Sequence, residues 1–348
     1  MAAGGRRMSE PAEIRFRRVM DGTDRSALAR LLRGTAACAE PFYAAAMRAR
    51  NWLIHGHPLG RPTISVGNIT TGGTGKTPVV RWLAASLAAA GRKPAILLRG
   101  YKSIEGISDE QMLLADGLGP SIPLIANPDR RRGAQQAMAQ SPGVDLFILD
   151  DGMQHRAAAR DFELVLIHAA EPFGLGRVFP RGLLREPLSG LARADAFLIT
   201  HASEVDAHRL DQMERTLRQH SPTAPIFRAD HVMTGLEALQ HQSFYAFCGI
   251  GSPGSFFSPL ATHGNCVDQR AFADHHHYTA SDLMDLDRAA RAAAAAVLAT
   301  TQKDWVKLSR LSPVAGALPI IPVGLCIRFH ADHEARLLEK IQGAIHGH

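Results

Sequence analysis

The sequence has few cysteines, and they are scattered along the chain. None of the four belongs to a C-x-x-C pair, and they are Cys38, Cys248, Cys266 and Cys326. This argues against a zinc ribbon or a disulfide framework and indicates a reducing compartment. Long apolar runs are also missing, since none approaches the ~20 residues that a membrane-spanning helix needs. The first ten residues, MAAGGRRMSE, have no apolar core behind their arginines. We therefore predict neither a spanning helix nor a secretory signal.

Negative charge is in the minority. The 348 residues carry 39 lysines and arginines against 33 aspartates and glutamates, a net charge of +6. Such a balance suits nucleic acid, an anionic membrane surface or a phosphorylated substrate. No aromatic ladder accompanies the arginines at positions 15 to 33, so we predict no nucleic-acid partner. A solvated basic tail and a membrane-binding segment both stay open.

Helical patterning begins after a poorly patterned start. Residues 1–25 lack apolar periodicity, and we expect this N-terminal extension to be loosely ordered. Residues 26–54 interleave leucines and aromatics with arginines. This basic amphipathic pattern is typical of a helix that lies in a membrane interface, although packing against its own domain would explain it as well. Pro41 interrupts the stretch, so we expect two helices.

An α/β rhythm follows. The apolar runs TISVGN, PAILLRG, DLFILDDG, FELVLIH and AFLIT predict strands separated by helices. This order is typical of a P-loop NTPase-like, mostly parallel sheet sandwiched by helices. SFYAFCGI, AVLATT and IIPVGLCIRF predict a second, smaller α/β domain that includes an alanine-rich helix near 289–296. The predicted divisions are a P-loop domain at 55–225, a junction at 226–242 and a C-terminal domain at 243–348.

The run GNITTGGTGKTP, residues 67–78, predicts a phosphate-binding loop. A strand precedes it and a helix follows it, which is the context that a P-loop requires. Glycines let backbone N–H groups approach phosphate, the lysine can reach the β- and γ-phosphates, and the last threonine can hold Mg²⁺. Position 70 lacks the usual first glycine, and position 71 lacks the lysine of partition-type ATPases. The expected phosphate-binding residues are Thr70, Thr71, Gly72, Gly73, Thr74, Gly75, Lys76 and Thr77.

Two carboxylates stand where a Mg²⁺-binding acid is expected. Asp150 and Asp151 end the strand DLFILDDG, and the carboxyl end of a parallel strand lies beside the phosphate loop. The roles of metal ligand and orienting partner stay unassigned between them. Guanine recognition would need an N-K-x-D loop, but in TTQKD the lysine and the aspartate are adjacent. We therefore expect ATP.

The sequence resembles the tetraacyldisaccharide 4'-kinases, the lipid A kinases of Gram-negative bacteria, from about Arg48 to the C-terminus. The resemblance is carried by RARNWLIHG, ISVGNITTGGTGKTP, LLRGY, DEQMLLA, ILDDGMQH, FGLGRVFPRGLLREPLSGLARAD, FCGIGSPGSFF, ADHHHYTASDL and TTQKDWVKL. Threonine in place of the first loop glycine is this family's form. The departures are Met153 for phenylalanine, Gln302 for glutamate, and Arg181 and Leu183 in PRGLLRE, a segment that more often reads P-A-G-P-L-R-E. They put fine substrate contacts in doubt rather than the activity.

The resemblance implies transfer of the ATP γ-phosphate to the 4'-hydroxyl of a tetraacylated glucosamine disaccharide 1-phosphate, which gives lipid IVA, with Mg²⁺ as cofactor. It places the catalytic base at Asp109, with Lys76 as a further catalytic group. His275 or His276 would support the base, and His275 is preferred. From the residues alone, Asp109 would be a helix N-cap. Three adjacent histidines cannot all face one metal ion, so a zinc site at DHHHY is not predicted.

Further site residues come from the same segments. Glu186 joins Thr77, Asp150 and Asp151 as a predicted magnesium ligand, with a surface helix start as its alternative. The predicted substrate contacts are Asn68, Gln154, His155, Arg185 and Arg131. Arg130 and Arg131 belong to NPDRRRGA, where a solvated turn is an equal alternative.

Two rival functions remain open at this stage. A partition- or maturation-type ATPase switch would need a lysine at position 71, where this chain has Thr71. A kinase for another sugar or nucleoside hydroxyl is excluded only by the length of the resemblance. A lipid acceptor stays in the bilayer, so we expect a peripheral protein on the cytoplasmic face of the bacterial inner membrane. We predict no obligate protein partner.

Overall fold

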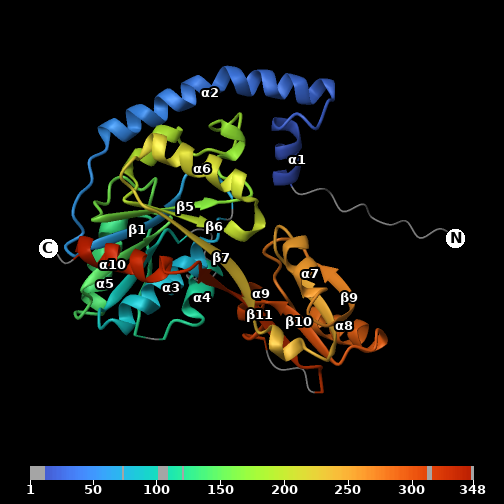
Figure 1. The fold of residues 1–348 in the computed structure, drawn as a ribbon. Helices are drawn as coiled ribbons and strands as arrows, with labels where there is room; N and C mark the ends of the chain where they lie inside the picture. Colours follow the sequence, from blue (N-terminus) through green and yellow to red (C-terminus); the bar gives the residue numbers. More distant parts are fainter. Residues whose placement is uncertain (1–11, 73, 101–108, 120, 312–315, 346–348) are drawn as a thin grey trace.

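The computed structural model describes residues 12–72, 74–100, 109–119, 121–311 and 316–345. They form two α/β units that share one twisted sheet, with a long helix along one side of the first unit (Figure 1). The sheet has eleven strands in the order β3-β2-β4-β1-β5-β6-β7-β11-β10-β8-β9. The described part of the chain therefore has the predicted α/β architecture.

Buried apolar runs form the strands. All six residues of β1 are buried, as are all five of β2, β4, β6 and β10, which is expected of strands covered by helices on both faces. The strands are β1 (Thr63–Asn68), β2 (Pro94–Leu98), β3 (Leu124–Ala126), β4 (Leu146–Asp150), β5 (Phe162–His168), β6 (Ala196–Thr200), β7 (Ile226–Thr234), β8 (Ser243–Cys248), β9 (Asn265–Ala271), β10 (Val297–Thr301) and β11 (Ile320–Phe329).

The helices alternate with the strands after a helical start. They are α1 (Ala12–Met20), α2 (Ala27–Leu53), α3 (Lys76–Ala89), α4 (Asp109–Ala115), α5 (Arg130–Gln140), α6 (Ala207–His220), α7 (Gly254–Leu260), α8 (Ala280–Ala292), α9 (Gln302–Leu308) and α10 (His333–Ile345). Short 3-10 turns are η1 (Gly174–Gly176), η2 (Leu188–Arg193), η3 (Ala202–Glu204) and η4 (Leu236–Leu239).

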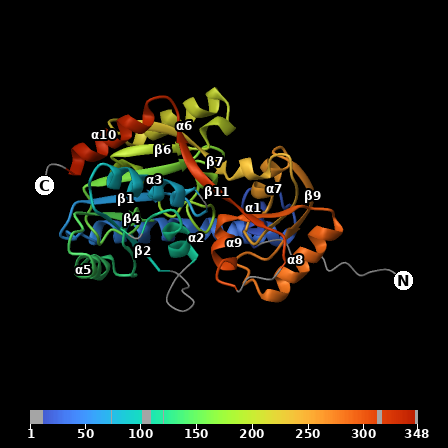
Figure 2. The ribbon, with the colours of Figure 1, turned by 90° about the horizontal axis from the view of Figure 1, so that it is seen from below.

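One antiparallel pair joins two parallel halves of the sheet. The first half of the sheet contains β1 to β7 and the second half contains β8 to β11. Within each half all neighbouring strands pair in parallel. Between the halves, β7 runs antiparallel to β11 from Ala229 opposite Phe329 to Thr234 opposite Gly324. Figure 2 shows these two strands running from one unit to the other. The predicted domain division at 226–242 stays a prediction, and this segment supplies β7 and η4.

Each unit buries apolar side chains on both faces of its part of the sheet. In the first unit, α3 and α10 share one core with β1, which includes Leu83 and Ile341. The opposite face has a second core, in which Met153 and Phe197 pack with Leu217 of α6. In the second unit, Phe256 of α7 and Leu286 of α8 belong to separate cores. The carboxyl ends of the parallel strands in the first unit are left to the loops that carry the predicted site.

The prediction that Pro41 separates two helices is wrong. Residues 27–53 form one helix, α2, with Pro41 inside it and Ser26 as N-cap, whose side chain accepts a hydrogen bond from the backbone of Ala29. A proline removes one N–H group and bends a helix, but it need not end a helix that continues on both sides. Figure 1 accordingly shows α2 as a single arched ribbon.

Two other expectations are corrected. Helix α1 forms within residues 1–25, which we expected to be loosely ordered; residues 1–11 lie outside the described residues. The alanine-rich helix, α8, starts earlier than expected because Thr279 and Asp282 form a capping box at its start. It ends at Ala292. Its end is followed by Ala294 with a φ of 59°, and a helix does not continue through such a left-handed residue.

Candidate active site

The phosphate-binding loop lies at the carboxyl end of β1. Gly75 is the N-cap of α3, with a φ of 71°, a left-handed conformation that glycine adopts without strain. No side chain caps α3 there, so its first backbone N–H groups remain available to an anion. Gly72 also has a positive φ, at 127°, whereas Gly73 lies outside the described residues. The loop therefore has the open helix start that phosphate binding requires.

The two threonines that replace the expected glycine and lysine fix the entry to this loop. Thr70 forms an antiparallel bridge with Leu184, and the backbone N–H of Thr71 donates to the carbonyl of Leu183 at 2.7 Å. Neither threonine has a positive φ. Glycine is not needed at position 70 because the backbone there is extended and paired with the LLREP segment.

Lys76 is held between an amide and a carboxylate. Its Nζ donates to Oδ1 of Asn68 at 2.9 Å and lies 3.3 Å from Oδ1 of Asp151. The Asn68 side chain in turn donates to the carbonyl oxygen of Thr70 at 2.9 Å. The predicted lysine, substrate amide and acid are thus in direct contact at the ends of β1 and β4.

The remaining loop side chains are threonines with different surroundings. Thr74 is buried, and within the described residues its Oγ1 has no hydrogen-bond partner. Its carbonyl accepts a hydrogen bond from Oγ1 of Thr200 at 3.3 Å. This bond ties the loop to the carboxyl end of β6. Thr77, the predicted metal ligand of the loop, lies in the first turn of α3 and is half-buried.

Asp151 faces two cations. It has a φ of 53°, and its carboxylate accepts hydrogen bonds from Nη1 of Arg185 at 2.9 and 2.7 Å. Burial would raise the pKa of Asp151, but the charges of Lys76 and Arg185 outweigh it and hold that pKa below its usual value. Asp151 is therefore ionised at neutral pH, as a phosphate- or metal-binding site would need.

Asp150 and the basic segment after β3 are built differently. Asp150 is buried at the end of β4, and its carbonyl accepts a hydrogen bond from Nη2 of Arg130 at 3.2 Å. Arg130 is itself buried and also donates to the carbonyl of Asn127. Arg131 is exposed at the start of α5. The segment is thus a helix start, in which Arg130 supports the end of β4 and Arg131 faces solvent.

Glu186 is the centre of a buried polar network. It is 1% exposed, and its carboxylate accepts hydrogen bonds from Arg193 at 2.8 Å, Asn51 at 2.9 Å and Gln154 at 3.1 Å. Gln154 also donates to the carbonyl of Asn68 at 3.0 Å. The predicted residues Glu186, Gln154 and Asn68 are therefore linked, and through Asn68 they reach Lys76.

Sequence reasoning missed two members of this network and one neighbour. Asn51 and Arg193 bind Glu186 directly, and the hydroxyl of Tyr43 donates to the carbonyl of Arg185 at 3.0 Å. Asn51 lies in RARNWLIHG and Arg193 lies in LSGLARAD, two segments that carry the family resemblance. Neither segment indicates by itself that these residues bind Glu186. Asn51 and Tyr43 belong to α2, and the second half of that helix is therefore part of the site.

His155 lies at the edge of the site. Burial first, and then the neighbouring charges of Arg130 and Arg160, lower its pKa to about 4. The ring is thus neutral at pH 7. It can accept or donate a hydrogen bond there but carries no charge for binding phosphate.

The histidine segment lies in the second unit, after β9. His275 has a φ of 59° and a side chain that is 60% exposed. Lys303 of α9 lies 3.5 Å from its Nε2 and 3.3 Å from Asp274. His276 is half-buried, 3.3 Å from Asp282, and stacks on Phe272 with ring centroids 4.6 Å apart. His275 is therefore the more accessible of the two predicted histidines.

Asp109 is the first residue of α4, and its side chain lies outside the described residues. Helix α4 packs against α9, and Gln302 at the start of α9 donates a hydrogen bond to Asp116, just past the end of α4. Helix α9 also carries Lys303, which contacts the histidine segment. The element that begins at Asp109 thus contacts the element beside His275.

The predicted magnesium ligands fit the chemistry of that ion without forming a ready-made cluster. Carboxylate and hydroxyl oxygens of Asp150, Asp151, Glu186 and Thr77 are the hard donors that Mg²⁺ prefers. Among the described residues, no three His, Cys, Asp or Glu side chains converge as a metal site would require. Asp151 and Glu186 are instead neutralised by arginines and Lys76.

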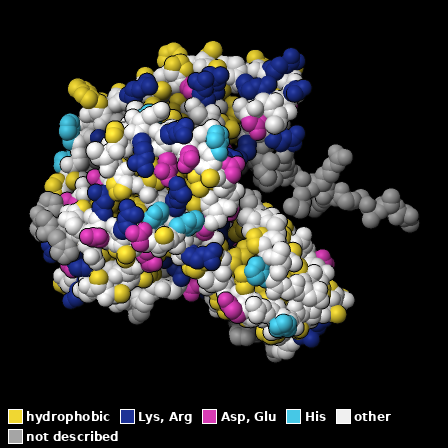
Figure 3. Space-filling view, in the orientation of Figure 1, with side chains coloured by type: hydrophobic (Ala, Val, Ile, Leu, Met, Phe, Trp, Pro, Cys, Tyr) yellow, Lys and Arg dark blue, Asp and Glu magenta, His cyan; other side chains and the backbone are white. Residues whose placement is uncertain are grey.

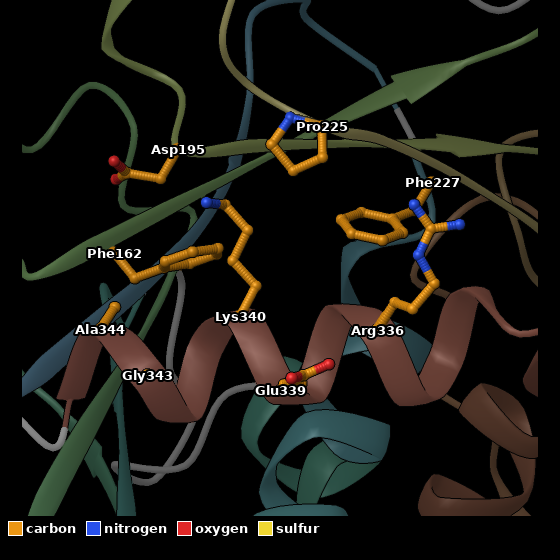
Figure 4. Close-up of a pocket in the computed structure, with 9 residues that line it drawn as sticks. All are labelled: Phe162, Asp195, Pro225, Phe227, Arg336, Glu339, Lys340, Gly343 and Ala344. Atoms are coloured by element: carbon orange, nitrogen blue, oxygen red, sulfur yellow. The ribbon is translucent and has the colours of Figure 1, made fainter.

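A separate pocket lies at the other end of the strands. Figure 4 shows it between α10 and the amino ends of β5, β6 and β7, with Lys340 near Phe162 and Arg336 beside Phe227. Its volume is about 620 Å³. None of the predicted site residues lines it. Ligands of parallel α/β sheets bind at the carboxyl ends of the strands, which favours the loop at residues 72–77.

Comparisons with known proteins agree on one family. The family model for tetraacyldisaccharide-1-P 4'-kinase matches residues 35–342. The tetraacyldisaccharide 4'-kinase of Halothermothrix orenii is 36% identical over 287 residues, which cover 71% of this chain and 74% of that protein. The enzyme of that name from Anaeromyxobacter sp. strain Fw109-5 is 39% identical over 289 residues, covering 75% of this chain and 76% of that protein.

A solved structure gives the same result for the fold. The crystal structure of the "apo" form of LpxK from Aquifex aeolicus in complex with ATP matches with a TM-score of 0.69 and 25% sequence identity. The match covers 90% of this chain and 99% of that one. It therefore includes both α/β units.

Proposed function

This chain belongs to the tetraacyldisaccharide-1-P 4'-kinase family. From that premise we propose which residues bind ATP, hold magnesium and act on the acceptor hydroxyl. The protein is an ATP-dependent kinase that phosphorylates the 4'-hydroxyl of a tetraacylated glucosamine disaccharide 1-phosphate in lipid A biosynthesis. The structural observation that carries the proposal is the contact of Lys76 with Asp151 at the open N-terminus of α3.

The loop and its lysine bind the triphosphate of ATP. Backbone N–H groups around residues 72–77 and the positive end of the α3 dipole face the phosphates. Lys76 lies at the first position of α3, and Asn68 and Asp151 hold its ammonium group there. A lysine held in place before the substrate arrives stabilises charge on the transferring phosphoryl without reorganising.

Four oxygen donors surround this loop and would hold magnesium. These are Thr77, Asp150, Asp151 and Glu186. When bound, the ion supplies positive charge that neutralises the phosphate oxygens. Arg185 shares Asp151 with Lys76, so it can pair with phosphate whenever a cation occupies that carboxylate.

The acceptor needs a base, because a sugar hydroxyl must lose its proton during attack on phosphorus. We assign this role to Asp109, with His275 as the accessible imidazole that supports it. The packing of α4 against α9 supports the assignment, because Lys303 of α9 contacts His275. His276 is instead engaged with Asp282.

The decisive test is phosphorylation of a purified disaccharide 1-phosphate lipid, followed by mass spectrometry. Asp109→Asn should lower turnover by about 10²- to 10⁴-fold while ATP still binds. Lys76→Met should lower kcat by about 10²- to 10³-fold. The exposed Asp211→Asn on α6 is a matched control and should change neither. Near-normal turnover of the Asp109 variant would refute the base assignment.

We further propose that α2 carries the protein to an anionic membrane surface. Within the described residues, no helix combines the length and apolarity needed to cross a bilayer. Leu31, Phe42 and Trp52 on α2 are nevertheless 64%, 78% and 79% exposed. Figure 3 shows hydrophobic side chains along the outer edge formed by α2, with basic side chains near its α1 end, where α1 and α2 carry arginines and no lysine. Apolar side chains beside arginines suit a membrane interface.

Vesicle co-sedimentation tests this surface. Wild-type protein should bind phosphatidylglycerol vesicles more than phosphatidylcholine vesicles, and high salt should weaken the binding. The double variant Leu31→Asp/Phe42→Asp should lose binding, whereas Met284→Asp, which is 48% exposed on α8, should retain it. Equal binding by both variants would exclude α2 as the contact.

A further inference from the structure

Three histidine rings meet next to the phosphate-binding loop. His168 ends β5, His201 follows β6 and His231 lies within β7. The rings of His168 and His201 stack with centroids 4.2 Å apart, and Nδ1 of His231 lies 2.8 Å from Nε2 of His201. On the far side, Nδ1 of His201 lies 2.7 Å from Oε1 of Glu204. Glu204, His201 and His231 thus form a continuous hydrogen-bonded chain.

The hydrogen positions in this chain follow from its chemistry. An ionised carboxylate only accepts hydrogen bonds, so Nδ1 of His201 must donate to Glu204. Nε2 of a neutral His201 is then an acceptor, and Nδ1 of His231 donates to it. A neutral His231 is left with a lone pair on Nε2. This nitrogen is buried and has no hydrogen-bond partner among the residues that the structure describes, so the chain ends in a proton acceptor.

That end lies against the phosphate-binding loop. A Cβ placed on Gly75 would be 1.8 Å from Cε1 and 2.6 Å from Nε2 of His231. The ring therefore packs directly on the backbone of the α3 N-cap. Gly75 needs to be glycine here for two reasons, its φ of 71° and the ring that fills the space of a side chain.

The surroundings keep His231 and His168 neutral in the absence of an anion. Burial first, and then the facing rings of His201 and His168, lower the pKa of His231 to about 4, while the backbone of Gly75 and the carboxylate of Asp230 act to raise it. Asp230 is paired with Ser203 and His330, and Ile327 of β11 lies opposite His231. Burial likewise lowers the pKa of His168 to about 4. The charge of Arg17 also lowers this pKa, and the charge of Glu204 raises it.

We propose that His231 is a positioning residue for the phosphate-binding loop, and that its Nε2 takes up a proton when nucleotide phosphates bind beside Gly75. A triphosphate brings several negative charges to the loop, and nearby negative charge favours an imidazolium. The chain from Glu204 stabilises the extra positive charge, and the new N–H group can donate toward the loop. The inference rests on the proposed binding of ATP at residues 72–77 and adds a coupling between that binding and protons.

The test is isothermal titration of MgATP at pH 6.0 and pH 8.0, in two buffers of different ionisation enthalpy, which gives the protons taken up on binding. Wild-type protein should take up a fraction of a proton more at pH 6.0 than His231→Gln. The ratio of the variant's Kd to the wild-type Kd should rise at least about threefold from pH 8.0 to pH 6.0. Protonation of the nucleotide itself is common to all proteins and cancels in the difference.

Two further variants complete the design. Glu204→Gln removes the charge at the exposed end of the chain, with little risk to folding because Glu204 is 58% exposed, and it should reduce the proton uptake. His208→Gln, an exposed histidine on α6, is the control and should match wild type. Equal proton uptake by wild type and His231→Gln, or by wild type and Glu204→Gln, would overturn the inference. Loss of the proposed function would look different, since ATP would then bind Lys76→Met as well as wild type.

Discussion

Lys76 and His275 belong to two regions that hold their side chains in different ways. In the first unit, Lys76 contacts Asn68 and Asp151, and the network continues to the buried Glu186. In the second unit, the His275 side chain is 60% exposed and lies 3.5 Å from Lys303. The groups proposed to bind phosphate are thus fixed by one another, whereas most of the side chain of the proposed partner of the base faces solvent.

In the second region, backbone hydrogen bonds hold the segment that carries His275. The N–H group of His275 donates to the carbonyl of Gly249 at 3.2 Å, and the N–H group of Gly249 donates to Oδ2 of Asp304 at 2.8 Å. Asp304 is fully buried. A single residue, Gly249, therefore links a buried carboxylate to the left-handed residue that presents the imidazole. Loss of a side chain from the network of the first region should unfold that region. Loss of a side chain in the second region should leave it intact, unless the side chain lost is that of Asp304.

The largest effect is expected for Glu186→Ala. The change removes a buried carboxylate and leaves Arg193, Asn51 and Gln154 without their acceptor. Breaking a buried ion pair in this way costs about 3–5 kcal/mol of unfolding free energy. Urea denaturation measures it. Glu186→Gln retains an acceptor and should lose less, and equal losses for the two variants would mean that the charge is not what matters.

Asp304→Ala should have the next largest effect. It deprives the N–H group of Gly249 and the hydroxyl of Thr301, which donates to Asp304 at 2.7 Å, of their acceptor. Unsatisfied buried donors cost about 2 kcal/mol. Because Gly249 also orients His275, turnover should fall too.

A variant on the surface of the same unit controls for this result. Asp285→Ala removes a carboxylate that is 50% exposed and pairs with Arg288. It should change stability by less than about 0.5 kcal/mol and leave turnover unaltered. If Asp304→Ala lost stability but kept full turnover, the backbone link from Asp304 to His275 would have no catalytic consequence.

Acid should weaken the first region through His155. Its pKa falls from 6.5 in the unfolded chain to about 4 in the folded protein, so the unfolded state binds a proton first as pH falls. Stability should therefore decrease between pH 6.5 and pH 4, by about 1 kcal/mol once the partial exposure of the ring is allowed for. His155→Gln should flatten the pH dependence of urea midpoints over this interval, whereas His208→Gln should leave it unchanged.

Local patterns allowed the strands and the loop to be predicted. TISVGN and the glycine-rich run were recognised because a buried strand and a phosphate loop are each specified by adjacent residues. Pairings across long separations were not. Asn51 and Glu186 are 135 residues apart, and β7 pairs with β11 across a whole α/β unit. Such contacts depend on how helices and strands pack, which periodicity does not encode.

The histidines show the same limit. His168 and His201 were visible at the ends of FELVLIH and AFLIT, yet nothing in either run shows that parallel pairing of β5 with β6 brings the two rings together. DHHHY, by contrast, is predicted through the family resemblance, which already favours His275, although the greater exposure of His275 compared with His276 is visible only in the fold. Resemblance thus named the residues, and the structure distinguished their surroundings.

His275→Ala should cause the smallest change in stability of these variants and a large change in turnover. Its side chain is 60% exposed, so the unfolding free energy should change by less than about 0.5 kcal/mol. Turnover should still fall, by about 10²-fold, because the base would lose its supporting imidazole. Urea denaturation and the lipid kinase assay on the same preparation separate the two quantities. A stability loss as large as that of Asp304→Ala would mean that the imidazole orders the segment, and the contrast between the two regions would then fail.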